Sequence, residues 1–418
     1  MRARSRGIAL ALSVIAATLL QARAAFAFSD VPTSYWDYTA IQYVASTHTY
    51  LQDFGTSTFK PTTGETRELL ARALVMAYAP TEPTDPKIRF PDLPSSDPFY
   101  RYANVATKLG WIPPWGSGNW MPLTVAKKQT FDRAIVLAMG LKAPASGLAA
   151  IHQGDGDHYV VSAFFPYQVI ANSLGLHFNH SVESSDLGAL SELHRDEVAY
   201  SLWRALTVQS WQLSEVARFD NITLPHLDES QATPKLKQAL TQYSFTGVTQ
   251  PYIWAGEWNT ATGNGYCCGS QPRGGFDCSG FTWWVMKKFE DGYNAAQFHP
   301  DYAGWSLADR SSSQMAEFAP SHITFSKLKI GDLMFFATNG GSSWSDVDHV
   351  ALWLGNNWLI HSSGSTDGPT IQYVGPGSYY NDIFVYGRRL IGVFDHPIRH
   401  PVDVLGGDGP REGGERRR

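Results

Sequence analysis

Cysteine is scarce in this chain. The sequence has 3 cysteines in 418 residues, and two of them, Cys267 and Cys268, are adjacent. This leaves Cys278 without an obvious partner in the sequence. An exported protein of this size with so few cysteines is not held together by a disulfide framework, so its stability must come from burial of apolar side chains.

Strong charge of one sign is also missing. The formal net charge is -5, and the lysines and arginines are scattered, with no basic block before the last residues. A nucleic-acid-binding surface needs a concentrated basic patch, so DNA and RNA are excluded as expected partners. Long apolar runs are absent as well: none of 18 or more residues follows the N-terminal segment, and we expect no membrane span in the mature chain.

The N-terminus has the features of a secretory signal. MRARSRG supplies three arginines, IALALSVIAATLL is apolar, and AFA before Phe28 offers a small-x-small cleavage site. We therefore expect residues 1–27 to be a signal peptide and the protein to be secreted. The alternative is a membrane anchor, but the apolar stretch is short for a bilayer core about 30 Å thick.

Three imperfect repeats follow. FSDVPTSYW begins at Phe28, FPDLPSSDPF begins at Phe90, and a looser third copy contains HYVVSAFFPY. Each repeat combines an aromatic opening, an amphipathic helix, a turn and a second helix with apolar residues at helical spacing. The repeats occupy 28–80, 90–142 and 152–210. Helix pairs repeated in this way pack on one another and share a core, which predicts an all-α unit.

Residues 28–210 resemble S-layer homology domains, which form a compact three-repeat pseudotrimer and bind secondary polymers of the bacterial cell wall. The family's most informative element is a Thr-Arg-Ala-Glu-like tetrad that starts each second helix. It corresponds to TREL from Thr66 and HRDE from His194, whereas the second repeat has KKQT from Lys127. The resemblance implies wall-polymer binding, with the second groove altered or empty.

Arg67 and Arg195 are the candidate polymer-binding residues in this resemblance. An arginine at a helix N-terminus combines a planar cationic fork with free backbone N–H groups, which suits an anionic glycan. The alternative is that both are solvated arginines paired with neighbouring acids.

The chain changes character after the repeats. Residues 211–235 lose periodicity and predict a linker. A second domain is expected over 236–400, and the Gly-rich charged segment 401–418 predicts a disordered tail.

Metal-binding patterns are incomplete. Asp155 and Asp157 have calcium-loop spacing without the downstream glutamate, and His177 and His180 lack further zinc ligands. We expect no metal and no cofactor.

The segment FDCSGFTWW contains Cys278 between an acid and a serine. Asp277 can cap a helix whose first turn carries the cysteine. A thiol at a helix N-terminus feels the positive end of the helix dipole, which lowers its pKa and favours the reactive thiolate. The alternative is an ordinary buried thiol at the start of an apolar helix.

A nucleophilic cysteine needs a base and a group that orients the base. DHVALWLGNNWLIHSSG predicts two strands joined at Gly355–Asn357, with His349 on the first strand and His361 on the second. A two-residue turn puts His361 opposite Leu352, on the face away from His349. A three-residue turn puts it opposite Ala351, on the same face as His349 and near enough to bond.

The second domain resembles the NlpC-type papain-like cysteine peptidases of bacterial cell walls. The matching motifs, in order, are PYIWAG, FDCSGF, DRSSSQM, IGDLMFF and DHVALWLGNNWLIHSS. The resemblance implies an α+β papain-like fold with an antiparallel sheet. It also implies that Cys278 is the nucleophile, His349 the general base and His361 its orienter, with Tyr252 near the cysteine.

The implied reaction is hydrolysis of a peptidoglycan stem peptide, most often at the bond from γ-D-glutamate to a diamino acid. Together the two resemblances predict a secreted, wall-anchored D,L-endopeptidase. One alternative is a wall-binding or structural protein with a non-hydrolytic papain-like domain. The other is an amidase or acyltransferase that uses the same triad.

Asp277, Ser279 and Arg310 are further candidates for substrate contacts. Asp277 can hold a substrate amine or act only as a helix cap, and Arg310 can equally be a surface residue. The chain also departs from the family pattern. A long stretch that contains Cys267 and Cys268 precedes FDCSG, and Ala255 replaces a common glycine.

Overall fold

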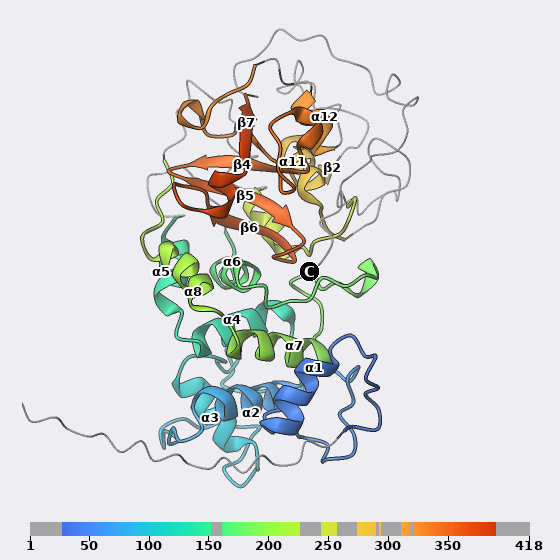
Figure 1. Ribbon diagram of the computed structural model, residues 1–418. Helices are drawn as coiled ribbons and strands as arrows, with labels where there is room; N and C mark the ends of the chain where they lie inside the picture. The colour runs from blue at the N-terminus through green and yellow to red at the C-terminus, as the bar shows by residue number, and fades with distance from the viewer. Residues whose placement is uncertain are drawn as a thin grey trace, which may run out of the picture.

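The computed structural model contains a helical N-terminal region and a C-terminal α+β region (Figure 1). It describes residues 27–151, 161–225, 244–256, 274–289, 292–293, 311–317, 319 and 321–389. The predicted signal peptide up to residue 26, the second half of the predicted linker, and the predicted tail lie outside the described residues.

The helices of the first region form three pairs, one from each repeat. The pairs are α1 Tyr38–Ile41, continued by the π-helical turn η1 Gln42–Thr47, with α2 Arg67–Tyr78; α3 Tyr100–Lys108 with α4 Lys128–Ala138; and α6 Phe165–Ser173 with α7 Arg195–Leu206. Further helices are α5 Lys142–Ala150, η3 Glu183–Ser185, α8 Ser210–Ala217 and η4 Arg218–Asn221.

A closed ring of backbone hydrogen bonds joins the three repeats just before their second helices. The N–H of Glu65 donates to the carbonyl of Leu193 (2.9 Å), that of Leu193 to Ala126 (2.9 Å), and that of Ala126 to Glu65 (2.8 Å). Each repeat thus makes the same contact with the next one. The three repeats therefore form one helical unit, as their packed helix pairs predict.

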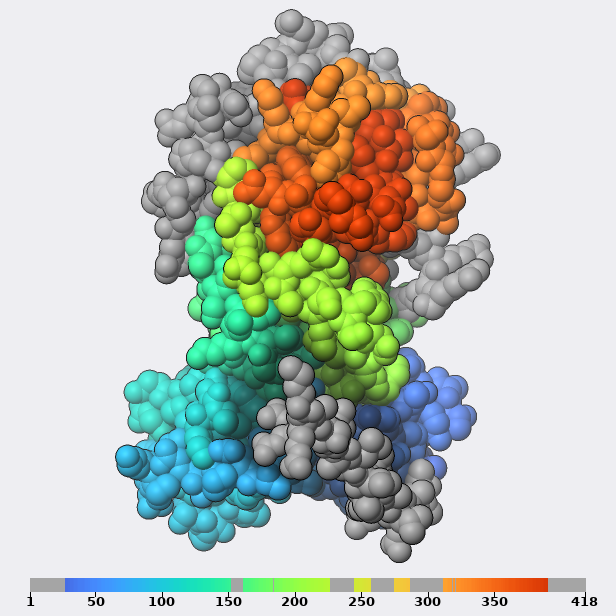
Figure 2. Space-filling model, turned by 60° about the vertical axis from the view of Figure 1, so that its left-hand side comes forward, coloured from blue at the N-terminus to red at the C-terminus, as the bar shows by residue number. Residues whose placement is uncertain are grey.

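The first half of the predicted linker is helical instead. Helix α8 and the 3-10 turn η4 cover residues that lack clear periodicity, and both pack against α5. The Phe219 ring stacks on Trp358 of the C-terminal region, with centroids 5.3 Å apart. Figure 2 shows this yellow-green segment lying against both regions. The periodicity is weak because few side chains of α8 are buried, Val216 among them.

The C-terminal region is built on a five-stranded antiparallel sheet with strand order β6-β5-β4-β3-β7. Its strands are β3 Leu333–Phe336, β4 His349–Gly355, β5 Trp358–Ser363, β6 Gly368–Tyr373 and β7 Phe384–Arg388. A separate two-stranded ladder is formed by β1 Lys288–Phe289 and β2 Gly292–Tyr293. The helices are α10 Ser244–Thr246, η6 Gly247–Thr249, α11 Cys278–Lys287, α12 Ser312–Glu317, η8 Phe325–Lys327, η9 Trp344–Asp346 and α13 Tyr379–Asp382.

The hairpin between β4 and β5 reaches the favourable register by a different route from either predicted turn. Gly355 pairs with Trp358 around a two-residue turn, but the register shifts between Trp353 and Gly355, so Leu352 pairs with Ile360. Continuing this register places His361 opposite Ala351. The turn residues Asn356 and Asn357 have φ values of 52° and 65°, as the favoured two-residue hairpin turn requires. A bulge therefore does what the three-residue turn was expected to do.

The two regions are in direct contact along the edge strand β6, which α6 covers. The Asn172 amide donates to the Pro369 carbonyl (3.1 Å), and the Thr370 hydroxyl donates to the Val169 carbonyl (3.2 Å). The Ser173 and Thr370 hydroxyls are also 3.1 Å apart. An uncovered edge strand invites pairing with another chain, and here a helix of the third repeat protects it. In the described part of the chain, no helix is long and apolar enough to cross a membrane.

Candidate active site

Cys278 begins helix α11, as the sequence predicts. The Asp277 carboxylate accepts the N–H of Gly280 (2.5 Å) and the hydroxyl of Ser279 (3.2 Å), so it caps the first turn. The cysteine is half-buried. A half-buried thiol on the first turn of a capped helix lies where the helix dipole favours the thiolate.

Two other segments are bonded to the chain just before the cysteine. Tyr252 forms a parallel bridge with Phe276, and the Ile253 N–H donates to the Phe276 carbonyl (3.1 Å). The Ser362 hydroxyl of β5 donates to the same carbonyl (2.8 Å). Phe276 is two residues before Cys278, and Ser362 directly follows His361. These bonds hold the PYIWAG segment and strand β5 next to the N-terminus of helix α11, where Cys278 lies.

The two predicted histidines are hydrogen-bonded to each other. Nε2 of His349 and Nδ1 of His361 are 2.7 Å apart, and the rings meet nearly at right angles (81°). Both side chains are buried, with 3% and 0% of their surface exposed. The predicted common face of β4 and β5 is therefore present. The bond leaves Nδ1 of His349 as the nitrogen available to a proton from another group.

The histidine pair is held in the neutral form. Burial and the neighbouring His361 lower the pKa of His349 well below its usual value, and burial lowers the pKa of His361 to about 4. Among the described residues, no carboxylate contributes to either shift, and the pair contacts the rings of Phe336 and Tyr380 instead. A neutral imidazole can accept a proton, so this environment suits a general base.

The predicted substrate contacts that the structure describes are buried. Asp277 and Ser279 are 2% and 0% exposed and bonded to each other, so the structure gives them a capping role rather than an open surface. Arg310 lies outside the described residues, as do Cys267 and Cys268. Tyr252 is 7% exposed and lies in the segment paired with Phe276.

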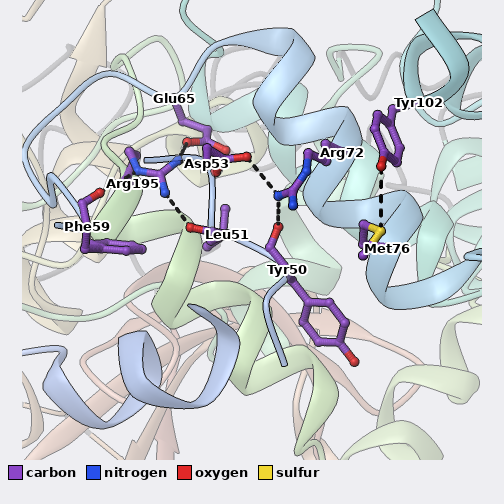
Figure 3. A network of polar contacts seen from close by, with 9 residues as sticks. All are labelled: Tyr50, Leu51, Asp53, Phe59, Glu65, Arg72, Met76, Tyr102 and Arg195. Carbon is purple, nitrogen blue, oxygen red and sulfur yellow. Dashed lines mark hydrogen bonds and ion pairs between the residues drawn. The ribbon is translucent and has the colours of Figure 1, made fainter. Parts of the chain in front are cut away.

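The position of Arg195 differs from the predicted polymer contact. Its side chain is fully buried, and Figure 3 shows it joining Asp53 and Glu65 with the Leu51 carbonyl. The distances from its guanidinium are 2.8 Å to Asp53, 3.0 Å to Glu65 and 2.7 Å to the Leu51 carbonyl. The tetrad arginine of the third repeat is thus a clamp on the first repeat. A surface role was expected because the sequence does not reveal that the preceding loops close over the helix start.

Arg67 makes the equivalent clamp between the first and second repeats. Its Nε donates to the Trp120 carbonyl (2.9 Å) and its Nη2 to the Pro113 carbonyl (2.9 Å), and the guanidinium lies over the Trp120 ring. The side chain is 6% exposed, and burial lowers its pKa to about 10. Both tetrad arginines are therefore buried at contacts between repeats, and a role for them in polymer binding stays a prediction.

The second repeat replaces the arginine by a different buried cluster. Lys128 lies 3.5 Å from Asp132, which also bonds to Nε2 of His177 at 2.6 Å. In the same region, Nε2 of His180 bonds to Glu197 at 2.6 Å. The histidines that the sequence singled out as incomplete metal ligands therefore each bond to a carboxylate. Within the described residues, no group of three or more metal-ligating side chains is found.

Two residues near the histidine pair were missed by sequence reasoning. Tyr380 packs against both rings, with centroids 5.5 Å from His349 and 5.0 Å from His361. Gln372 lies on β6, where Leu359 pairs with it and His361 pairs with Thr370. The strand register was the only signal that could have identified Gln372, and it needed the β5–β6 pairing.

Comparison with known proteins assigns the C-terminal region. Residues 249–389 match the NlpC/P60 family model and form an NlpC/P60 domain. No S-layer homology domain is identified in the chain, so that resemblance stays a prediction.

Curated relatives match over the same domain. Protein P54 of Enterococcus faecium is 33% identical over 30% of this chain and 17% of its own length. Murein DD-endopeptidase MepH of Escherichia coli is 29% identical over 34% of this chain and 42% of its length. The Gamma-D-glutamyl-L-lysine dipeptidyl-peptidase of Bacillus cereus is 27% identical over 44% of this chain and 43% of its length. The chain thus spans less than half of each of these relatives.

A solved structure of an NlpC/P60 family protein from Bacillus cereus is 26% identical, with a TM-score of 0.26. It covers 38% of this chain and 41% of that one.

Proposed function

We propose that the protein is a secreted peptidoglycan hydrolase that cleaves stem peptides by a Cys-His-His mechanism. The observation that carries the proposal is the buried 2.7 Å bond between His349 and His361, on strands tied to the segment that leads into Cys278. A hydrogen-bonded pair of neutral imidazoles beside a helix-start cysteine supplies a base, its orienter and a nucleophile. The endopeptidase names of the relatives favour peptidoglycan as the substrate.

The chemistry follows from these roles. Nδ1 of His349 takes the thiol proton of Cys278, and the thiolate attacks the scissile carbonyl carbon. The backbone N–H of Cys278 stabilises the oxyanion. His349 then gives its proton to the leaving amine, and an acyl-enzyme thioester remains. Water, deprotonated by His349, attacks the thioester, releases the carboxylate product and restores the thiol.

The bond that we propose is the one from γ-D-glutamate to the diamino acid. One relative carries this specificity in its name, whereas the MepH relative is named a DD-endopeptidase, which makes the D,D cross-link the second candidate.

The test is digestion of purified muropeptides by the full chain, with Cys278→Ala as the control. Mass analysis of the fragments distinguishes the two bonds. New amine termini in the wild-type digest alone are expected. Failure of wild-type protein to cleave any muropeptide, amide or ester would favour a binding protein instead.

We also propose that the helical region holds the enzyme to a wall polymer. The closed ring of three repeats supports this, but the buried clamps Arg67 and Arg195 leave the contact to other side chains. Full-length Cys278→Ala protein should sediment with purified wall sacculi and lose binding after hydrofluoric acid removes the secondary polymers. Equal binding to extracted sacculi would assign the affinity to peptidoglycan and contradict polymer anchoring.

A further inference from the structure

The proton positions that catalysis requires in the histidine pair put a buried N–H on Nε2 of His361. If His349 is to accept a proton on Nδ1, its other nitrogen, Nε2, must donate to Nδ1 of His361 across the 2.7 Å bond. His361 must then carry its own proton on Nε2. That nitrogen is buried and has no hydrogen-bond partner within the part of the chain that the structure describes. A buried donor without an acceptor is costly, so the tautomer that catalysis needs is not secured by the pair alone.

The surroundings of His361 offer few acceptors. The Tyr380 ring lies on one side at 88° to the imidazole, and Phe336 packs against Tyr380. The Thr370 hydroxyl, directly across from His361, donates to the Val169 carbonyl and lies 3.1 Å from the Ser173 hydroxyl, so its bonds run to α6.

Gln372 is the polar side chain that remains. It is paired with Leu359, so it lies on the same face of the β5–β6 ladder as His361, one diagonal step away. Diagonal neighbours on an antiparallel ladder are within reach of a long side chain.

We propose that Gln372 is a positioning residue: its side-chain carbonyl accepts the Nε2 proton of His361 and so fixes the tautomer that leaves Nδ1 of His349 free to act as the base. The role rests on the proposed function of the pair. The Gln372 side chain acts against the burial that lowers the pKa of His361, as a hydrogen bond from the ring to the amide oxygen would. The chain of groups then runs from Cys278 through both histidines to β6, the strand that α6 of the helical region covers.

No charged side chain takes part in this arrangement. The described groups placed around the pair are Phe336 of β3, Tyr380 of α13, and Thr370 and Gln372 of β6. Helix α11, which begins with the titratable thiol of Cys278, packs against β4 and β5. A carboxylate introduced at 372 would therefore be the one anion beside His361 among the described residues. Gln372→Glu becomes a sensitive probe, and Gln372→Leu removes the acceptor at similar size.

The first measurement is independent of activity. Long-range 1H–15N spectra of the histidine rings, recorded on full-length Cys278→Ala protein, report which nitrogen of His361 carries the proton. We expect His361 to be the Nε2–H tautomer when residue 372 is glutamine, and a mixture of tautomers when the Gln372→Leu substitution is added. An unchanged Nε2–H tautomer in a folded Gln372→Leu protein would overturn the role of Gln372, whether or not the protein is a peptidase.

The second measurement is the pH profile of kcat/KM. We expect Gln372→Leu to lower kcat/KM by about 3- to 10-fold, as loss of one hydrogen bond to a reacting group would. Gln372→Glu should move the acid limb to higher pH by about one unit, because an adjacent anion favours the imidazolium. The control is Tyr373→Phe, because Tyr373 is next to Gln372 on the opposite face of β6. This variant should change neither kcat/KM nor the pH of the acid limb. Identical profiles for the wild type, Gln372→Leu and Gln372→Glu would contradict the proposal, and Gln372→Glu keeps this test available if the leucine variant does not fold.

Discussion

The helical region and the sheet each bury two histidines, but they give them different partners. His177 and His180 bond to the carboxylates of Asp132 and Glu197, both at 2.6 Å. His349 and His361 bond only to each other among the described side chains. The bond to Glu197 helps to raise the pKa of His180, whereas burial and the charge of Lys128 lower the pKa of His177 despite its bond to Asp132. A second imidazole brings no negative charge, so the pair on the sheet stays neutral and able to accept a proton. The same residue type is structural in one region and chemically available in the other.

The largest expected effect tests this difference directly with matched variants. His349→Gln should lower kcat/KM for a muropeptide by about 10²- to 10⁴-fold, because it removes the general base. His177→Gln should leave kcat/KM within about threefold. It should instead lower the free energy of unfolding by about 2–3 kcal/mol, because buried Asp132 loses a hydrogen-bond partner. Steady-state kinetics and urea unfolding separate the two outcomes. Equal losses of kcat/KM in His349→Gln and His177→Gln would contradict the assignment of a catalytic role to the one histidine and a structural role to the other.

The second prediction concerns the clamp that closes the helical ring. Arg195→Ala should destabilise the protein by about 3–5 kcal/mol, because it leaves Asp53 and Glu65 buried without their shared cation. Burial already raises the pKa of Glu65 to about 8 against the attraction of Arg195. Lys108→Ala breaks the partly exposed pair with Glu82 and is the control, with an expected change of about 0–1 kcal/mol. Both are measured by chemical denaturation. Comparable losses in the two variants would show that Arg195 is not a structural clamp.

The third prediction follows from the opposite pKa shifts of His361, which is lowered, and His180, which is raised. The pKa of folded His361, about 4, lies below an unfolded value of about 6.5, so the unfolded chain binds the proton first as the pH falls. Its stabilising contribution is complete above pH about 6.5 and is lost toward pH 4, by roughly 3 kcal/mol at most. Burial lowers the pKa of His180, but the bond to Glu197 and the negative charges of Glu197, Asp186 and Asp196 together outweigh burial and raise the pKa. That contribution is present below pH about 6.5 and is lost as the pH rises through the folded value.

Urea unfolding at pH 8, 6.5 and 5 checks both directions. His361→Asn should flatten the acid side of the stability profile, and His180→Gln should flatten the alkaline side. An acid-side loss that persists undiminished in His361→Asn would assign it to other groups.

Sequence reasoning succeeded where local patterns decide the structure. Asp277 caps α11 as its position before Cys278 predicts, and strands β4 and β5 begin and end close to where the apolar runs do. Period-two alternation put His349 and His361 on a common face only for a three-residue turn, whereas the structure reaches that face with a two-residue turn and a bulge. These features depend on a few consecutive residues, whose chemistry is visible in the sequence.

What the sequence did not predict depends on contacts between distant segments. The contacts of Arg195 require the loop at Leu51–Phe59 to close over it. The bulge before Gly355 lets a two-residue turn reach the register that was expected of a three-residue turn. Gln372 becomes relevant only once β6 pairs with β5. In each case the side chain is the same in isolation, and the tertiary contact decides its function.

The smallest expected effect comes from strained backbone at one selected position in each region. Ala255, where related domains are expected to carry glycine, has φ 56°, and Thr49 has φ 60° at a turn where the next repeats place Gly110 (φ 74°) and Gly175 (φ 61°). A left-handed conformation costs a residue with a Cβ roughly 1 kcal/mol, and more when the Cβ is branched, while glycine adopts it freely. Ala255→Gly and Thr49→Gly should therefore each raise the free energy of unfolding by up to about 1 kcal/mol, with the larger gain at Thr49. Thermal and urea unfolding measure the gains, and Gly110→Ala, which introduces the same strain into the second repeat, should lower stability by a similar amount. If Gly110→Ala were neutral, backbone strain would not set the stability of these turns, and the glycine gains would need another cause.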